Sequence, residues 1–381
     1  MGKKYRKWKG RDDHFYDFSE IHMILIVIGT RPEIIKMSPV IRECSKNSLE
    51  YSVLHTGQHY SYAMDKIFFE QLDLGFPKYN LDVGSGTHGA QTAAILEGVE
   101  KILLKDPPGI VLVQGDTNTV CAGALAAAKL HIPVGHVEAG LRSFDRSMPE
   151  EINRIVADHI SDQLFAPTEI SHQNLLREGI AAEKITVTGN TVVDAVQQNI
   201  KIGQQKVHPL ESLALEPRGY FLVTAHRAEN VDDAIRLGEI LKSLRNISGY
   251  FGIPVVFPMH PRTQKMVREF SLPTEGIRVI DPVGYLEFLI LESKAALILT
   301  DSGGVQEESC ILSVPCVTLR ENTERPETLE TGSNILAGTN PEKILAAAEK
   351  MITIPRNWSN PFGTGDAAHR IIDACKKTGN I

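Results

Sequence analysis

The sequence predicts an α/β protein that contains two doubly wound parallel sheets. Short apolar runs alternate with helix-like stretches, and this alternation starts at Met23 and again after Asn190. Polar or glycine-rich residues follow most of the apolar runs, as expected where parallel strands end at a ligand-binding edge. The chain has 381 residues, which is more than one ordinary core accommodates, so two domains are expected.

The first domain is expected to span 23–196. Its predicted strands are continuous apolar runs at 24–28, 51–54, 110–114 and 134–137, which is typical of strands covered on both faces. Its predicted helices lie at 34–45, 90–104 and 120–130, and Pro32 suits the first turn of the first helix.

The second domain is expected to span 218–362, with strands at 221–225, 254–257, 278–280, 296–300 and 314–319. Residues 197–217 are largely polar and contain Gly203, Pro209 and Pro217, which predicts a linker. A C-terminal segment, 363–381, is expected to return to the first domain through a helix at 367–377. The two domains should face each other across a cleft lined by loops of both.

The first 22 residues differ from the rest because they are rich in lysine and arginine. No apolar core follows, as a secretory signal would require, so we expect a disordered or non-native leader. The net charge of −7 argues against a nucleic-acid or membrane-surface partner. The five cysteines are scattered and have no metal-binding spacing, which favours a reduced, cytoplasmic protein without a metal.

An anion site is predicted where the strand at 296–300 ends. Asp301-Ser302-Gly303-Gly304 follows and then a helix begins, so backbone N–H groups and the positive end of the helix could hold a phosphate. Arg325 follows the next strand in a charged loop. The alternative is a tight turn with Ser302 as the helix N-cap, and a solvent-exposed Arg325 that has no ligand.

Carboxylates follow strands of the first domain. Asp116 and Glu138 each come after a predicted strand, and Glu150 and Glu151 open a later helix. Carboxylates that converge on one cleft repel each other, which raises their pKa values and suits proton chemistry. The alternatives are a helix cap for Asp116, helix-dipole pairing for Glu150 or Glu151 and a salt bridge for Glu138.

Residues 84–89 match the dinucleotide-binding pattern G-x-G-x-x-G, but their context does not fit. The pattern belongs to the first strand–helix unit of a sheet, which lies about sixty residues earlier here. About twenty residues further on, where that fold places an acidic residue, the chain has Lys105-Asp106-Pro107-Pro108. We therefore expect a glycine-rich loop at the rim of the cleft and no nicotinamide cofactor.

Eight motifs in order resemble the non-hydrolysing UDP-N-acetylglucosamine (UDP-GlcNAc) 2-epimerases. They are GTRPE at 29–33, TGQH at 56–59, QGDT at 114–117, HVEAGLR at 136–142, PEE at 149–151, TGNT at 188–191, TDSGG at 300–304 and ERPE at 324–327. The resemblance implies a GT-B-like fold, a homodimer, and interconversion of UDP-GlcNAc and UDP-N-acetylmannosamine (UDP-ManNAc) without a cofactor. It also implies a role in supplying ManNAc-type precursors for polysaccharide or glycan synthesis.

The resemblance also implies roles for individual residues. Asp116, Glu138 and Glu150 would be the acid–base groups, with His226 at the diphosphate. UDP would contact Arg31, Lys36, Ser302, Gly303, Gly304 and Arg325, with Glu308 at the ribose and Phe288 at the uracil. Gln58 and His59 match part of a motif at which related enzymes bind a second UDP-GlcNAc as an activator.

Four other functions remain open from the sequence. They are a hydrolysing epimerase that releases UDP and ManNAc, a GT-B glycosyltransferase, an NAD-dependent epimerase and a non-catalytic nucleotide-sugar sensor. The sequence also leaves open which carboxylate serves which face of the sugar.

Overall fold

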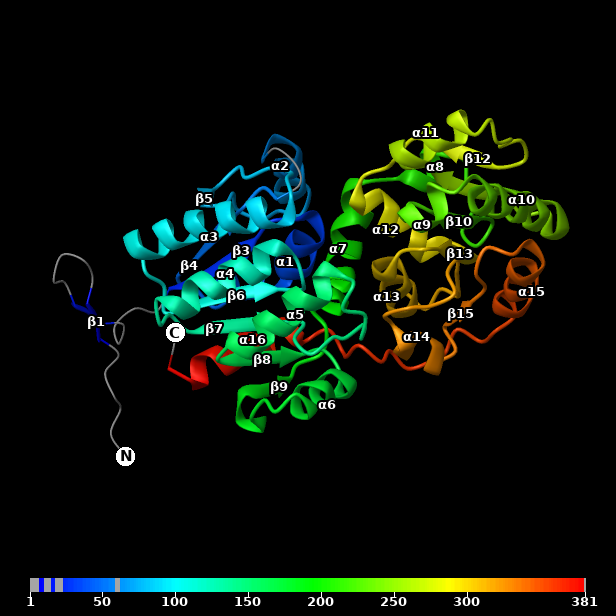
Figure 1. Ribbon diagram of the computed structural model, residues 1–381. Coiled ribbons are helices and arrows are strands. Elements are labelled where there is room, and N and C mark those ends of the chain that lie inside the picture. Colours follow the sequence, from blue (N-terminus) through cyan, green and yellow to red (C-terminus); the bar gives the residue numbers. More distant parts are fainter. Residues whose placement is uncertain (1–6, 10–14, 18–22, 59–61, 380–381) are drawn as a thin grey trace. The chain divides into compact units, whose positions relative to one another are not determined.

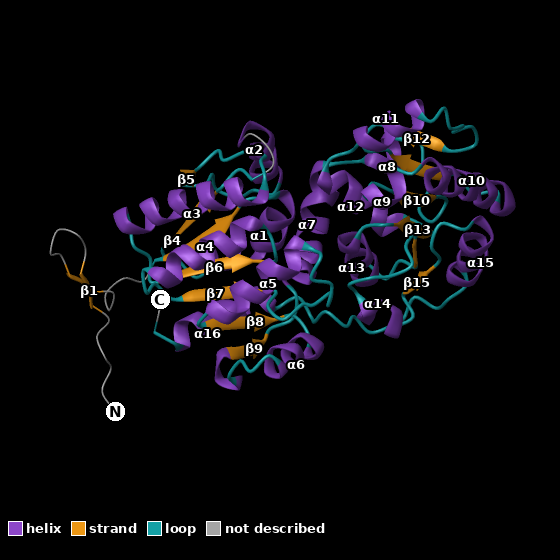
Figure 2. Ribbon diagram, viewed as in Figure 1, coloured by secondary structure: helices purple, strands orange, loops and turns teal. Residues whose placement is uncertain are grey.

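The computed structural model describes residues 7–9, 15–17, 23–58 and 62–379. The chain forms two compact units, Met1–Ala195 with Gly363–Ile381 (unit 1) and Val196–Phe362 (unit 2). Each unit has a parallel sheet with helices on both faces (Figures 1 and 2). The expectation of two doubly wound α/β domains is therefore confirmed.

The sheet of unit 1 has the strand order β5-β4-β3-β6-β7-β8-β9, and all neighbouring strands are parallel. In chain order the strands are β3 (Ile24–Ile28), β4 (Tyr51–His55), β5 (Tyr79–Asn80), β6 (Ile110–Gln114), β7 (Val134–Val137), β8 (Gln163–Ala166) and β9 (Ile185–Val187). The chain winds from β3 to one edge, returns to β6, and winds to the other edge. The carboxyl ends of β3 and β6 therefore form the switch point where doubly wound sheets bind ligands.

The helices of unit 1 alternate with these strands. They are α1 (Arg31–Lys46), α2 (Tyr62–Gln71), α3 (His88–Lys105), α4 (Asn118–Lys129), α5 (Pro149–Ile160), α6 (Glu169–Arg177) and α16 (Ala367–Lys377), with α7 (Thr191–Lys206) running on into unit 2. A core beneath α3 and α4 includes Val27, Ile95, Val111 and Val120, each fully buried. Continuous apolar strands form here because both faces of the sheet are covered.

The sheet of unit 2 has the order β12-β11-β10-β13-β14-β15, again with parallel neighbours. Its strands are β10 (Phe221–Thr224), β11 (Val255–Pro258), β12 (Arg278–Ile280), β13 (Leu297–Thr300), β14 (Cys316–Thr318) and β15 (Asn334–Leu336). Its helices are α8 (Pro209–Ser212), α9 (Ala228–Val231), α10 (Ala234–Phe251), α11 (Pro261–Glu269), α12 (Tyr285–Lys294), α13 (Gly303–Ile311), α14 (Pro326–Glu330) and α15 (Pro341–Ile352). The ends of β10 and β13 form its switch point.

The segment predicted as a linker, 197–217, is mostly helical. It contains the second half of α7 and the whole of α8. Some of its polar residues lie on α7, which also carries buried positions such as Asn199. The C-terminal helix α16 packs on α1 in unit 1, and Asp194 accepts hydrogen bonds from Ala367 N (3.3 Å) and Ala368 N (3.1 Å).

In the leader, β1 (Lys7–Lys9) pairs antiparallel with β2 (Phe15–Asp17), which the sequence did not predict.

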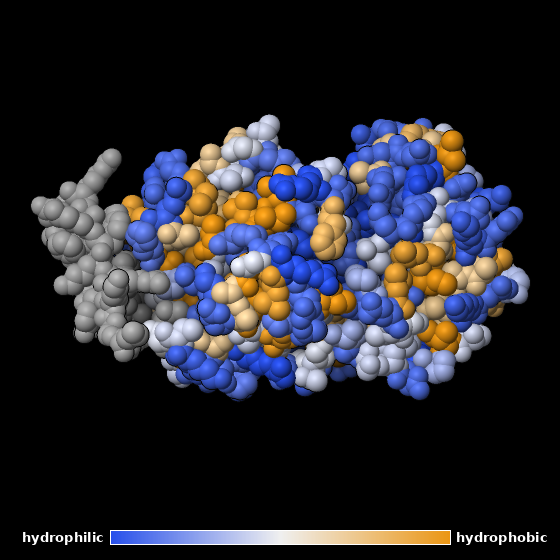
Figure 3. All heavy atoms as spheres, turned by 60° about the horizontal axis from the view of Figure 1, so that its bottom comes forward, coloured by the Kyte–Doolittle hydropathy of each residue, from blue (hydrophilic) through white to orange (hydrophobic). Residues whose placement is uncertain are grey.

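Across residues 7–9, 15–17, 23–58 and 62–379, no helix has both the length and the apolarity needed to cross a membrane. On the face shown in Figure 3, hydrophobic residues lie among hydrophilic ones.

Candidate active site

Glu33 joins the two loops at the switch point of unit 1. Its carboxylate is buried and accepts hydrogen bonds from Gly29 N (2.5 Å) and Thr30 N (3.1 Å) after β3, and from Thr117 Oγ1 (2.5 Å) after β6. Burial raises the pKa of Glu33 to about 7, because its hydrogen bonds replace only part of the lost hydration. Glu33 was not among the predicted site residues, although Thr30 and Glu33 form the capping box of α1.

Glu138 follows β7 and is the most constrained of the predicted carboxylates. Its φ is +68°, a left-handed conformation that costs a residue with a Cβ about 1–2 kcal/mol. The side chain is buried, and Lys36 Nζ donates to Oε1 (2.7 Å) and Oε2 (2.9 Å). Gln114, at the end of β6, also donates to Oε2. Retained strain of this kind is characteristic of functional positions.

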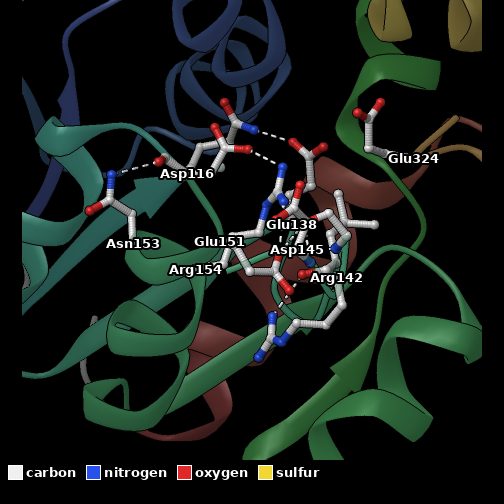
Figure 4. A network of polar contacts seen from close by, with 12 residues as sticks. Asp116, Glu138, Arg142, Asp145, Glu151, Asn153, Arg154 and Glu324 are labelled. Atoms are coloured by element: carbon white, nitrogen blue, oxygen red, sulfur yellow. Dashed lines mark hydrogen bonds and ion pairs between the residues drawn. The ribbon is translucent and has the colours of Figure 1, made fainter. Parts of the chain in front are cut away.

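Asp116 lies at the end of β6 and forms an ion pair with Arg154 of α5 (Figure 4). Asn153 Nδ2 donates to the backbone oxygen of Asp116 at 3.0 Å. The Asp116 side chain is 30% exposed, so its carboxylate stays accessible to a ligand. Thr117, not Asp116, provides the cap of α4, because its hydroxyl accepts from Val120 N. The capping alternative for Asp116 is therefore wrong.

The adjacent residues Glu150 and Glu151 have different environments. Glu151 is buried and accepts from Ser143 N (2.9 Å), Phe144 N (3.0 Å) and Arg154 (3.0 Å). Burial opposes ionisation of Glu151, but these donors outweigh it and lower its pKa. Glu151 thus anchors the loop before α5, while Glu150 is partly exposed.

A pocket of about 300 Å³ brings together several of the predicted groups of unit 1. It is lined by Asp116 and Glu150, by Ser85 and Gly86 of the glycine-rich loop, and by Gln58, among others. Gln58 Oε1 accepts from Thr119 N (3.1 Å) and Thr119 Oγ1 (2.8 Å), so this side chain also has a structural role. His59 lies outside the described residues. Arg31, at the start of α1, places its guanidinium 5.1 Å from the ring centre of Phe68.

Asp301 organises the switch point of unit 2. This buried carboxylate follows β13 and accepts from His226 N (3.0 Å) and Arg227 N (3.0 Å), which follow β10. Asn230 Nδ2 donates to it as well, at 3.1 Å. The bonds fix the His226 backbone beside the N-terminus of α13.

Packing within the protein does not explain why residues 303 and 304, at the start of α13, are glycines. Ser302 is the N-cap of α13, but its side chain makes no capping hydrogen bond. A Cβ added to Gly303 would come no closer than 3.8 Å to another atom, Glu324 Oε2, and one added to Gly304 would meet Ser302 Oγ at 3.9 Å. The helix start has room for larger residues, so contacts within the protein do not require glycine at either position.

Arg325 is largely buried and forms an ion pair with Glu307. Its side chain is only 12% exposed and donates from Nε to Glu307 Oε1 at 2.6 Å, while Nη1 donates to Glu324 O at 3.0 Å. Glu307 is 1% exposed. The alternative of a solvent-exposed Arg325 is therefore wrong, because its buried partner Glu307 lies 18 residues earlier, on α13.

A second pocket, of about 230 Å³, lies in unit 2. Its lining includes His226, His260, Val283 and Phe288. Glu308 lies on α13, is nearly buried, and accepts a hydrogen bond from the Tyr285 hydroxyl at 3.4 Å. No cluster of three or more His, Cys, Asp or Glu side chains suited to a metal ion occurs in the part of the chain that the structure describes.

Known proteins of one family match nearly the whole chain. Residues 42–376 match the family model described as UDP-N-acetylglucosamine 2-epimerase. A UDP-N-acetylglucosamine 2-epimerase of Methanocaldococcus jannaschii is 58% identical over 354 residues, covering 91% of this chain and 97% of that protein. A UDP-2,3-diacetamido-2,3-dideoxy-D-glucuronate 2-epimerase of Pseudomonas aeruginosa is 44% identical, covering 93% and 99%.

Solved structures agree with this match and with a GT-B-like fold. The M. jannaschii epimerase in complex with UDP-GlcNAc and UDP has a TM-score of 0.84 and 56% identity, covering 93% of this chain and 99% of that one. The Neisseria meningitidis UDP-GlcNAc 2-epimerase bound to UDP-GlcNAc also has a TM-score of 0.84, at 34% identity, covering 93% and 100%. The chain belongs to the UDP-N-acetylglucosamine 2-epimerase family and is an epimerase.

Proposed function

We propose that the protein interconverts UDP-GlcNAc and UDP-ManNAc at carbon 2 of the sugar without hydrolysing either. The observation that carries this proposal is the pair of strand-end carboxylates in unit 1. Asp116 is held by Arg154 and Glu138 by Lys36, and Glu138 retains a strained backbone. The M. jannaschii relative binds UDP-GlcNAc and UDP, which are a substrate and a fragment that this reaction would generate.

The chemistry requires the sugar–phosphate bond to break first. The proton at carbon 2 has no adjacent carbonyl and is not acidic. When the bond between carbon 1 and oxygen breaks, its electron pair leaves with UDP and carbon 1 gains positive charge. A carboxylate then removes the proton from carbon 2, and the C–H electrons form the double bond of 2-acetamidoglucal.

The reverse steps give the epimer. A proton is delivered to carbon 2 on the opposite face, and an oxygen of UDP returns to carbon 1. Two faces need two acid–base groups, which we assign to the set Asp116, Glu138 and Glu150. Lys36 supports the same step, because its two hydrogen bonds stabilise the ionised form of Glu138.

Unit 2 provides groups suited to the leaving diphosphate. We assign its oxygens to the Ser302 hydroxyl and to the N–H groups of Gly303 and Gly304, which stand at the positive end of α13. His226 would add hydrogen bonds and Arg325 positive charge, and the family resemblance also assigns Arg31 and Lys36 to UDP. Phe288, which shares a pocket with His226, would pack on the uracil, and Glu308 would accept from the ribose hydroxyls.

Incubation with UDP-GlcNAc alone, followed by NMR of the products, tests the proposal. We expect UDP-ManNAc to form without NAD or an acceptor, and no free ManNAc. Free ManNAc would support the hydrolysing reaction, and no turnover would support a transferase or a sensor. Because the P. aeruginosa relative is named for UDP-2,3-diacetamido-2,3-dideoxy-D-glucuronate, that compound should be assayed in parallel. Faster turnover of it would contradict the proposed substrate.

Three wider proposals follow from the family resemblance. We propose that the protein is a homodimer, that it acts in the cytoplasm, and that its product feeds polysaccharide or glycan synthesis. Sedimentation velocity tests the first of these. Activation by a second UDP-GlcNAc at Gln58 is a fourth proposal, and a hyperbolic rate curve for the wild type would count against it.

A further inference from the structure

His136 is a fully buried residue of β7 whose two ring nitrogens both face acceptors. Nδ1 lies 2.6 Å from Asp158 Oδ1, and Nε2 lies 2.8 Å from the backbone oxygen of Gly115. A carbonyl oxygen cannot donate, so Nε2 must carry a proton. An ionised Asp158 requires a proton on Nδ1 as well, so the ring is an imidazolium.

The charges around His136 support this state. Burial alone would lower the pKa of His136, but the charge and hydrogen bond of Asp158 outweigh it and the pKa is raised. Burial opposes ionisation of Asp158 too, but His136 and Arg142 lower its pKa. Arg142 Nη2 lies 2.7 Å from Asp158 Oδ2, and Arg142 Nε donates to Glu178 at 2.7 Å. The four side chains thus form a set with balanced charge, in which His136, Asp158 and Arg142 are buried and Glu178 is partly exposed.

This set joins the two loops that carry the proposed acid–base groups. Gly115, which accepts from His136, immediately precedes Asp116. Asp158 accepts at 3.2 Å from the backbone nitrogen of Gly140, two residues after Glu138. His136 itself lies two residues before Glu138, so the strained Glu138 is held on both sides.

Stability alone does not explain such a set. Ions lose their hydration when buried, and apolar residues of similar volume often give equal or greater stability. Apolar residues, however, would leave the Gly115 oxygen and the Gly140 nitrogen without these hydrogen bonds. The directional bonds of the charged pair fix both loops in one arrangement.

We propose that His136 and Asp158 are positioning residues that hold Asp116 and Glu138 at the separation that the proposed epimerisation requires. This inference rests on the proposed function. Neither residue lines the pocket that contains Asp116 and Glu150. Proton transfer at carbon 2 should therefore depend on the pair, whereas UDP binding should not.

The test compares His136→Gln and Asp158→Asn with the control Glu178→Gln. Glu178 belongs to the same charged set, but its side chain is 27% exposed and its hydrogen bonds come from the Arg142 side chain rather than from the backbone of either loop. Activity would be measured below the melting temperature of each variant and divided by the number of UDP-binding sites found by calorimetry. A misfolded fraction then does not count as a loss of turnover.

We expect kcat and exchange of the carbon 2 proton with deuterated water to fall together, by about 10- to 100-fold, in both test variants. A displacement of about 1 Å of a reacting group has an effect of this size. The Kd for UDP should change less than about twofold, and Glu178→Gln should keep its kcat. Unchanged kcat in both test variants, or an equal loss in Glu178→Gln, would overturn the proposal.

Two controls keep the outcome interpretable. If neither test variant folds, nitrogen-15 NMR of the wild-type ring still tests the premise. Two protonated ring nitrogens between about pH 6 and 8 support it, and a neutral ring overturns it. An inactive wild type would contradict the proposed function, whereas an active wild type with unaffected variants would contradict only the positioning role.

Discussion

Replacing Glu33 with glutamine should remove a pH dependence of folding. In the folded protein the Glu33 carboxylate is buried between the loops that follow β3 and β6, and its pKa is raised from 4.5 to about 7. Glutamine has the shape of the protonated acid. Its oxygen can accept from Gly29 N and Thr30 N, and its amide can donate to Thr117 Oγ1, so Glu33→Gln should fold.

Because the pKa of Glu33 is raised in the folded protein, this residue makes the wild type less stable as the pH rises. Between pH 4.5 and about 7 the folded wild type holds a proton on Glu33 that the unfolded chain has lost. The stability contributed by this proton is fully present below pH 4.5 and is lost as the pH rises through about 7. At about 1.4 kcal/mol per pH unit, the wild type should lose roughly 2.5 kcal/mol from this residue between about pH 5 and 8.

Urea denaturation at a series of pH values, followed by circular dichroism, measures this loss. The change in unfolding free energy between about pH 5 and 8 should differ between wild type and Glu33→Gln by roughly 2.5 kcal/mol. Other titrating groups are common to both proteins and cancel in the difference. Equal pH dependence in the two proteins would show that Glu33 has an ordinary pKa and would refute the reasoning.

Three other predictions address the proposed site. Asp116→Asn, Glu138→Gln and Glu150→Gln should each fold and lose about 10²–10⁴-fold in kcat, and normal carbon 2 exchange in deuterated water in all three would contradict their roles. Gly303→Ala should keep or slightly raise the melting temperature, because the new methyl group meets nothing closer than 3.8 Å. It should weaken UDP binding by obstructing the diphosphate, and calorimetry showing unchanged affinity would exclude that contact. Arg325→Ala should cost on the order of 3 kcal/mol of stability, because it removes an ion-pair partner of the buried Glu307. Arg325→Ala should also weaken UDP binding, and a stable variant would show that this ion pair does not support the fold.

The central strands could be predicted from the sequence because they are continuous and apolar. Ile24–Ile28, Ile110–Gln114 and Val134–Val137 occupy the predicted positions. The strands β5, β8, β9 and β15 were missed. They are two to four residues long, and β9 contains the exposed residues Thr186 and Val187. Such short strands, of which β5, β9 and β15 lie at sheet edges, depend on pairing with a neighbouring strand, which a local pattern does not reveal.

The sequence pointed to many of the candidate site residues, but not to the partners that their side chains contact. Strand ends and helix starts pointed to Asp116 and Glu138 in unit 1 and to the Ser302-Gly303-Gly304 turn in unit 2, because each doubly wound sheet brings such positions to its own ligand-binding edge. Contacts between distant residues could not be inferred in this way. The pairing of Arg325 with Glu307 and of His136 with Asp158 depends on how helices pack on the sheet. Local spacing therefore selected the candidate residues, and tertiary packing determines which charged groups surround them.

Positional isotope exchange tests the central claim most directly. UDP-GlcNAc would be labelled with oxygen-18 in the oxygen that bridges carbon 1 and the β-phosphorus, and incubated with the protein in deuterated water. If carbon 1 releases UDP before carbon 2 loses its proton, the freed phosphate can rotate, and the label should move to non-bridging positions in UDP-GlcNAc and UDP-ManNAc. We expect this movement together with deuterium at carbon 2. Deuterium uptake with the label still in the bridge would contradict elimination of UDP.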